Sequence, residues 1–252
     1  MSLPGHERPD RWPEMEPRPD RPYVWVNCAV SADGRLAYAG GTRARLSSPE
    51  DLVRVQRLRL RVDAILVGVG TVLADDPSLR IHRELLGEDP SASHDGPRSG
   101  PLRVVLDSRG RTPEKARLLD GKQPTAVLTV ERSARRFPPH VSVGAFGRER
   151  VALRPALKWL LRKGTRRLLV EGGSEVISSF LREGVVDHMT VYVAPVVIGG
   201  RTAPSMVSGR ETHDAEEAVP LRLVDVVRLG EGALLTWSAV PKKPSESAVE
   251  KP

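Results

Sequence analysis

Two short glycine turns, each placed between an apolar run and a helix-forming run, constrain this chain most. The first turn, Gly68–Thr71, follows the apolar run Ala64–Val67, and the second, Gly172–Ser174, follows Leu168–Val170. Glycines at the end of a strand let main-chain N–H groups approach a ligand closely, and the positive end of the next helix attracts phosphate. Together the two turns indicate a nucleotide cofactor.

The order of the apolar runs predicts an α/β fold with a mixed, mostly parallel sheet flanked by helices. Strands are expected at Tyr23–Val30, Val62–Val67, Leu102–Leu106, Thr125–Val130 and Arg167–Val170, and helices near 49–61, 154–162 and 174–182. The last third has strand-like runs separated by turns, without clear helices. These runs predict antiparallel edge strands at His188–Ala194, Leu221–Val227 and Ala233–Val240.

Composition divides the chain into one folded domain and two tails. Residues 1–21 and 241–252 are rich in proline and charge and poor in apolar periodicity, so both are predicted to be disordered. The remaining residues, 22–240, are long enough for a single α/β domain. Within it, the polar stretch Gly87–Gly100 is predicted to be a surface insertion.

Charge and cysteine content exclude several classes of protein. The 39 Lys and Arg against 32 Asp and Glu give a net charge of +7, which suits an anionic ligand but is spread along the chain, so no nucleic-acid partner is expected. Cys28 is the single cysteine, which rules out an internal disulfide and favours a reduced, cytoplasmic protein. No apolar run approaches the ~20 residues of a membrane span. The six histidines lack zinc spacing, and we expect no metal.

Motif spacing also argues against two common enzyme folds. A Rossmann turn would place a third glycine at Leu73, and its acidic residue would fall in the polar insertion. A Gly-x-Ser-x-Gly nucleophile elbow is absent from the sequence. Glu171 is more informative, because a carboxylate at the carboxyl end of a strand can accept hydrogen bonds from a polar ligand ring. The alternative for both turns is a plain tight turn or helix start.

Several motifs in a fixed order give the chain a specific resemblance. Over residues 22–240 it resembles the riboflavin-pathway pyrimidine ribosylamino-phosphate reductases, which have a dihydrofolate-reductase-like fold. The motifs are Asn27, Ser31–Arg35, Gly68–Leu79, Val104–Ser108, Glu171–Ser174, Asp187–Pro195 and Ile198–Gly200. Because no zinc-deaminase signature precedes Tyr23, the similarity is to the stand-alone archaeal or fungal type.

The resemblance implies a reaction, a cofactor and a set of site residues. The reaction is reduction of the ribosylamino group of 2,5-diamino-6-ribosylamino-4(3H)-pyrimidinone 5′-phosphate to the ribitylamino form by NADPH, with NADH as the alternative donor, in a homodimer. The implied cofactor contacts are Asn27, Ala29, Thr71, Asp75, Ser108, Arg109, Gly172, Gly173, Ser174 and Glu175. The implied substrate contacts are Arg43, Arg45, Arg59, Leu79, His82 and Glu171.

Two details of this assignment rest on the residues themselves. Ser108 and Arg109 are candidates for an adenosine 2′-phosphate, because a hydroxyl and a guanidinium both form strong bonds to phosphate. The proton donor to the substrate nitrogen stays open among Glu171, Asp33 and water. The chain also departs from bacterial relatives, some of which place arginine where His82 stands.

Three other functions compete with this interpretation. A dihydrofolate reductase would place an acidic residue on the pterin-facing helix, where this chain has Arg57 and Arg59. A reductase of the deaminated compound, 5-amino-6-(5-phosphoribosylamino)uracil, differs only in one exocyclic group of its substrate. From another class, a non-catalytic nucleotide- or RNA-binding protein fits the pI of about 10.0 but not the 4% aromatic content.

Overall fold

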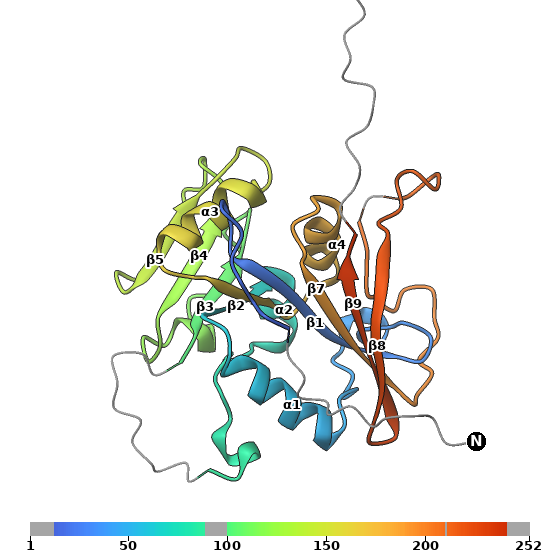
Figure 1. Cartoon of the computed structure of the whole chain (residues 1–252). Coiled ribbons are helices and arrows are strands. Elements are labelled where there is room, and N and C mark those ends of the chain that lie inside the picture. The colour runs from blue at the N-terminus through green and yellow to red at the C-terminus, as the bar shows by residue number, and fades with distance from the viewer. Residues whose placement is uncertain (1–12, 89–99, 210, 241–252) are drawn as a thin grey trace, which may run out of the picture.

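The computed structural model describes residues 13–88, 100–209 and 211–240. They form one nine-stranded sheet with the strand order β5-β4-β3-β2-β6-β1-β7-β9-β8 (Figure 1). Strand β9 is antiparallel to both of its neighbours, and all other pairs are parallel. The strands are β1 Tyr23–Ser31, β2 Ala64–Gly68, β3 Leu102–Leu106, β4 Thr125–Thr129, β5 Val141–Ala145, β6 Arg167–Val170, β7 His188–Ala194, β8 Leu221–Leu229 and β9 Gly232–Ala239.

Helices cover both faces of this sheet. Successive side chains at the start of strand β1 are apolar and point to opposite faces, so both faces must be covered. Val24 and Val26 pack in a core with the apolar residues of α3 (Leu153–Arg162) and α4 (Ser174–Arg182). Tyr23 and Trp25 point the other way, into a second core with α1 (Pro49–Arg59) and α2 (Val69–Asp75). Because successive strand residues face opposite sides, a strand that is apolar throughout is buried on both faces.

The first helix begins where its sequence signals place it. Ser48 is the N-cap, and its hydroxyl accepts a hydrogen bond from the N–H of Asp51 at 3.2 Å. Pro49 occupies the first helical position and Glu50 the first turn, both of which favour a helix start. Short 3₁₀ helices add turns at Ala39–Gly41, Arg83–Leu86 and Arg117–Leu119.

The predicted fold class is confirmed, with two differences in detail. Strand β7 pairs parallel with β1, whereas the sequence predicted an antiparallel strand there. The reason is the crossover: α4 lies between β6 and β7 in the chain and brings β7 back in the same direction. Strand β5 was not predicted, because it is a short edge strand with polar and small residues between its apolar ones.

The predicted tails and insertion fall largely outside the described residues, namely 1–12, 89–99 and 241–252. The described part of the N-terminal tail contacts the domain, since Arg18 and Arg21 both form ion pairs with Asp187. The Asp187 carboxylate also accepts the N–H of Val24 at 2.9 Å, which links this segment to β1.

Within the described ranges, every helix is too short or too polar to cross a bilayer.

Candidate cofactor and substrate site

The two glycine turns meet at the edge of the sheet where the parallel strands end. The N–H of Gly68, the last residue of β2, donates to the carbonyl oxygen of Gly172 at 3.1 Å. A Cβ at Gly173 would lie 3.3 Å from Thr71 Oγ1, and one at Gly68 would lie 2.6 Å from Val176 Cγ2. The structure thus brings the two sequence motifs together into one cradle made mostly of main chain.

Glycine is required in the second turn, and its geometry leaves room for a ligand. Gly172 and Gly173 have φ angles of 120° and 71°, in the region that favours glycine. A Cβ at Gly172 would meet no atom within 4 Å, so open space lies beside it. Gly173 is the N-cap of α4 and provides no side-chain cap, which leaves the first N–H groups of that helix available to an anion.

Three further side chains that were predicted as cofactor contacts, Ser174, Glu175 and Thr71, border this cradle. Ser174 Oγ accepts a hydrogen bond from Ser208 Oγ at 2.8 Å, whereas Glu175 is exposed at the start of α4. Thr71 lies in α2, directly opposite Gly173. These residues, all predicted as cofactor contacts, lie around one space.

Ser108 and Arg109 follow β3, at the same edge of the sheet. The fully buried Asp107 fixes their loop, because its carboxylate accepts the N–H and the hydroxyl of Thr112 at 2.8 and 2.7 Å. Ser108 Oγ accepts the N–H of Val151 at 3.1 Å, which leaves its own proton free to donate. Arg109 is exposed. A hydroxyl that is free to donate and an exposed arginine are therefore adjacent residues of this loop, and their role as a 2′-phosphate site stays a prediction.

Arg59 and Glu171, both predicted as substrate contacts, form a bidentate ion pair. Arg59 Nε donates to Glu171 Oε1 at 2.8 Å, and Nη2 donates to Oε2 at 2.6 Å. The side chains are 13% and 10% exposed. Burial opposes the charge of Arg59, but the Glu171 carboxylate and its hydrogen bonds outweigh this effect and raise the pKa of the guanidinium. Arg59 is therefore a fixed cation within the site, unlike a residue on a solvated helix face.

Asn27 occupies the middle of β1 and is held from α1. Its Oδ1 accepts hydrogen bonds from Arg54 Nη2 at 2.7 Å and from Thr190 Oγ1 at 2.8 Å. Because the oxygen is committed to these two donors, Asn27 has its Nδ2 group to offer to a ligand. Ala29 lies two residues further on the same face of β1 and packs against the apolar cluster around Tyr192.

Arg54 and Asp51 are the residues that the sequence interpretation missed. Arg54 is 2% exposed, and its Nε donates to Asp51 Oδ1 at 2.9 Å. Both residues face the core side of α1, together with Leu58. Their spacing of three on the face that carries Leu58 is a signal that could have identified a buried pair.

Asp33 takes a different position from the one expected of a proton donor. Its carboxylate accepts hydrogen bonds from Ser31 Oγ at 2.6 Å and from the N–H groups of Ile198 and Gly199 at 3.0 and 2.8 Å. These bonds, that from Ser31 first, lower the pKa of Asp33 from 3.8 to about 2. The group is therefore deprotonated at neutral pH, and it connects the turn after β1 to the loop after β7.

We expect the stability of the protein to report this role of Asp33 in acid. Because the pKa is lower in the folded state than in the unfolded chain, the ionised carboxylate contributes its full stabilisation above about pH 4, and this is lost as the pH falls toward about 2. Urea midpoints measured for the wild type and Asp33→Asn at pH 7 and pH 3 test this. The difference between the two proteins should shrink at pH 3, and a constant difference would contradict it.

The remaining predicted contacts lie at the end of α2 and in nearby loops. Arg43 and Asp75 approach each other: burial raises the pKa of Asp75, and the charge of Arg43 partly offsets that rise. Arg45 is exposed in the same loop as Arg43. The His82 N–H donates to Gln56 Oε1 at 2.8 Å, and its Nδ1 lies 2.8 Å from Glu84 Oε1. His82 is thus attached to α1, the helix that carries Arg59.

Leu79, predicted as a substrate contact, is buried. Its side chain is 2% exposed and belongs to the core beneath α1, and its φ is 52°. Because the side chain is buried in this core, a contact of Leu79 with a ligand would have to come from its main chain. A sequence motif alone does not distinguish these two modes of contact.

Comparisons with known proteins show similarity over most of the chain. The chain is 42% identical over 220 residues to the 2,5-diamino-6-ribosylamino-4(3H)-pyrimidinone 5′-phosphate reductase of Archaeoglobus fulgidus, covering 86% of this chain and 97% of that protein. It is 39% identical over 226 residues to the reductase of the same name from Methanothermobacter thermautotrophicus, with coverages of 86% and 98%. The solved structure of Acinetobacter baumannii RibD, form 1, has a TM-score of 0.74 at 28% identity, covering 88% of this chain and 59% of that one.

The family assignment follows from the extent of the match. Residues 22–235, which include both glycine turns and the Arg59–Glu171 pair, match the family described as the RibD C-terminal domain. The two archaeal relatives are matched over nearly their whole length. This chain belongs to the RibD C-terminal domain family.

Proposed function

We propose that this protein reduces 2,5-diamino-6-ribosylamino-4(3H)-pyrimidinone 5′-phosphate to its ribitylamino form in riboflavin biosynthesis, with NADPH as the electron donor. Two archaeal relatives of similar length carry the name of this reductase. The observation that carries the proposal is the fixed Arg59–Glu171 pair at the edge of the sheet where the two glycine turns form their cradle. The Glu171 carboxylate can recognise a polar ring, and the two glycine turns beside it can bind a dinucleotide.

The reaction requires the protein to bind the substrate and the cofactor and to orient them, since the cofactor supplies the hydride. The N-ribosylamine opens to an imine, C1′ gains a hydride, and the nitrogen gains a proton. A nicotinamide supplies the hydride when it is bound. Binding that ring and the sugar carbon against each other accounts for much of the rate enhancement expected here.

Each part of the site has a proposed task. The first N–H groups of α4 and the open space beside Gly172 suit the diphosphate of the cofactor. The Nδ2 group of Asn27 is a donor for the carboxamide oxygen of the nicotinamide. Ser108 and Arg109 suit a 2′-phosphate, which favours NADPH over NADH.

The substrate is proposed to lie on the α1 side of the cradle. Glu171 accepts hydrogen bonds from the amino groups of the pyrimidine ring, while Arg59 holds the carboxylate in place. Arg43, Arg45 and His82 surround the position proposed for the 5′-phosphate. Because the pKa of Asp33 is about 2, and because both oxygens of the Glu171 carboxylate accept hydrogen bonds from Arg59, we assign the proton donor to a water molecule that Glu171 holds.

We also propose a homodimer. Strand β8 is an edge strand, and its side chains Leu223, Val224 and Val226 are each more than half exposed. An exposed apolar edge of this kind is typical of a surface that pairs with a second copy.

The test is to follow NADPH absorbance with three candidate substrates in parallel. We expect oxidation with the diaminopyrimidinone phosphate and a lower kcat/KM with its deaminated analogue, and we expect no oxidation with dihydrofolate. NADH in place of NADPH should raise the KM for the cofactor, because the 2′-phosphate contacts are lost. Oxidation with dihydrofolate alone, or only with the deaminated compound, would overturn the proposed substrate.

A further inference from the structure

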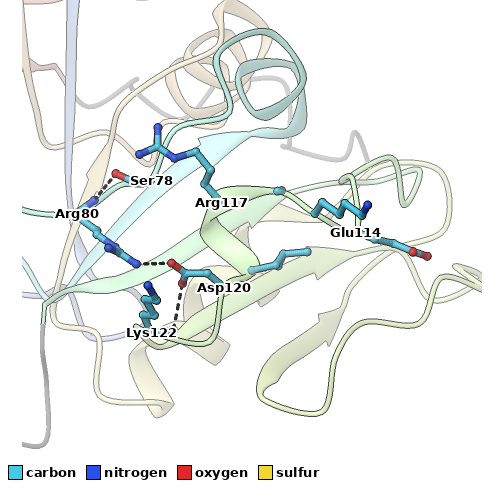
Figure 2. A pocket seen from close by; sticks show the side chains of 9 residues that line it. Ser78, Arg80, Glu114, Arg117, Asp120 and Lys122 are labelled. Atoms are coloured by element: carbon cyan, nitrogen blue, oxygen red, sulfur yellow. Dashed lines mark hydrogen bonds and ion pairs between the residues drawn. The ribbon is translucent and has the colours of Figure 1, made fainter.

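A pocket of about 440 Å³ lies beside the 3₁₀ helix Arg117–Leu119 and contains none of the residues assigned to the reductase site. Figure 2 shows Arg80, Asp120 and Lys122 gathered on one side of it and Glu114 on the other. Its floor includes Ala116 and Leu119, both at most 5% exposed. The volume is within the roughly 300–1,000 Å³ of small-molecule sites.

The pocket is cationic, because its two carboxylates are already paired. Glu114 forms an ion pair with Arg135, with 3.5 Å between its Oε1 and Nη1. Asp120 is bound by Arg80 on one oxygen and by Arg103 Nη2, at 3.0 Å, on the other. Desolvation acts against the charge of Asp120, but the Lys122 N–H and the two arginines outweigh it and hold the pKa below its usual value.

A buried guanidinium lies beneath the pocket and fixes its floor. The Arg103 side chain is fully buried and donates to Thr125 Oγ1 at 3.0 Å and to the carbonyl of Gln123 at 2.7 Å. Asp120 is the carboxylate that compensates it. Because Asp120 is committed to Arg103 and Arg80, it offers little charge to the lining cations. Among the described residues, the side chains of Lys115 and Arg117, which line the pocket, form no ion pair.

We propose that this pocket is a second ligand site, which binds a small phosphate-bearing anion through Lys115 and Arg117 over the apolar floor of Ala116 and Leu119. Two unpaired cations at the rim of one hollow match the several oxygens of a phosphate or diphosphate group. The apolar floor suits a ligand with an organic part.

Arg80 connects this pocket to the Arg59–Glu171 pair. The Arg80 side chain lines the pocket, and its carbonyl oxygen accepts Arg59 Nη1 at 2.7 Å. An anion that attracts Arg80 away from Asp120 therefore acts on the residue that positions Arg59. This gives the site a regulatory effect on substrate affinity, and that part of the inference rests on the proposed function.

The first experiment measures binding without activity. Inorganic pyrophosphate is titrated by calorimetry into full-length Arg43→Ala/Arg45→Ala protein saturated with NADP⁺, so that the diphosphate cradle is occupied and the proposed 5′-phosphate site is weakened; the variants compared in this titration are made in this background. We expect one binding event whose Kd rises about tenfold or more in Lys115→Ala/Arg117→Ala, since each residue contributes a charge-assisted bond. The matched control is Lys158→Ala/Arg162→Ala, which removes the same charges from the exposed face of α3.

The outcomes distinguish binding in this pocket from nonspecific attraction by positive charge, and they test the pocket independently of the proposed function. Absence of binding at millimolar pyrophosphate, binding that persists in the pocket variant, or an equal loss in the control variant would each overturn the site. The second experiment measures the KM for the pyrimidine substrate with and without pyrophosphate. A change in KM in the wild type and control that disappears in the pocket variant supports the link through Arg80, and an unchanged KM would overturn it.

Discussion

Replacing Glu171 with glutamine is expected to lower kcat about a hundredfold while the Kd for NADPH changes by less than about threefold. The carboxylate lies beside the cradle for the dinucleotide, and it is held by two hydrogen bonds from Arg59. A glutamine side chain keeps the size but can accept only one of these bonds, and its NH₂ group faces a guanidinium that also donates. Substrate orientation and proton supply are lost together, whereas the glycine turns are unchanged.

Steady-state kinetics and fluorescence titration of NADPH measure the two quantities separately. Glu183→Gln is the matched control, because it makes the same change at the other end of α4 and should leave both quantities unaffected. Equal losses of turnover and of NADPH affinity in Glu171→Gln would contradict a role of Glu171 on the substrate side. An unchanged kcat would remove Glu171 from the chemistry altogether.

The sequence was sufficient for the features that depend on local pattern. Strands such as Arg167–Val170 and the start of α1 at Ser48 follow from apolar runs and capping residues. The two glycine turns were recognisable for the same reason. Their position at one edge follows from parallel strands, whose carboxyl ends lie together. The residues within each turn are therefore enough to predict the cradle, without knowledge of contacts across the sheet.

Contacts between distant residues could not be predicted in the same way. The Arg59–Glu171 pair spans 112 positions and depends on β6 lying between β1 and β2. Resemblance placed both residues at the substrate, but not against each other. The support of Asn27 by Arg54 was missed because a charged helix residue is usually exposed. The low pKa of Asp33 depends on main-chain N–H groups at Ile198 and Gly199, which no sequence pattern connects to it.

Replacing Gly173 with alanine is expected to weaken NADPH binding at least about tenfold, since main-chain bonds to the diphosphate are disturbed. Its φ is 71°, and the new Cβ would lie 3.3 Å from Thr71 Oγ1, where the two turns meet. The strained backbone itself should cost roughly 1–3 kcal/mol of folding stability. Any loss of affinity must therefore be distinguished from partial unfolding.

Gly184→Ala provides that distinction. Gly184 has a φ of 62° in open space just beyond the C-terminal end of α4, so the variant carries a similar backbone strain at the end of the helix away from the cradle. Both variants should unfold at lower urea concentration than the wild type, but only Gly173→Ala should lose NADPH affinity in a fluorescence titration of the folded protein. Equal affinity in the two variants would mean that the dinucleotide does not lie against the second turn. The main-chain cradle would then be a structural joint between β2 and α4.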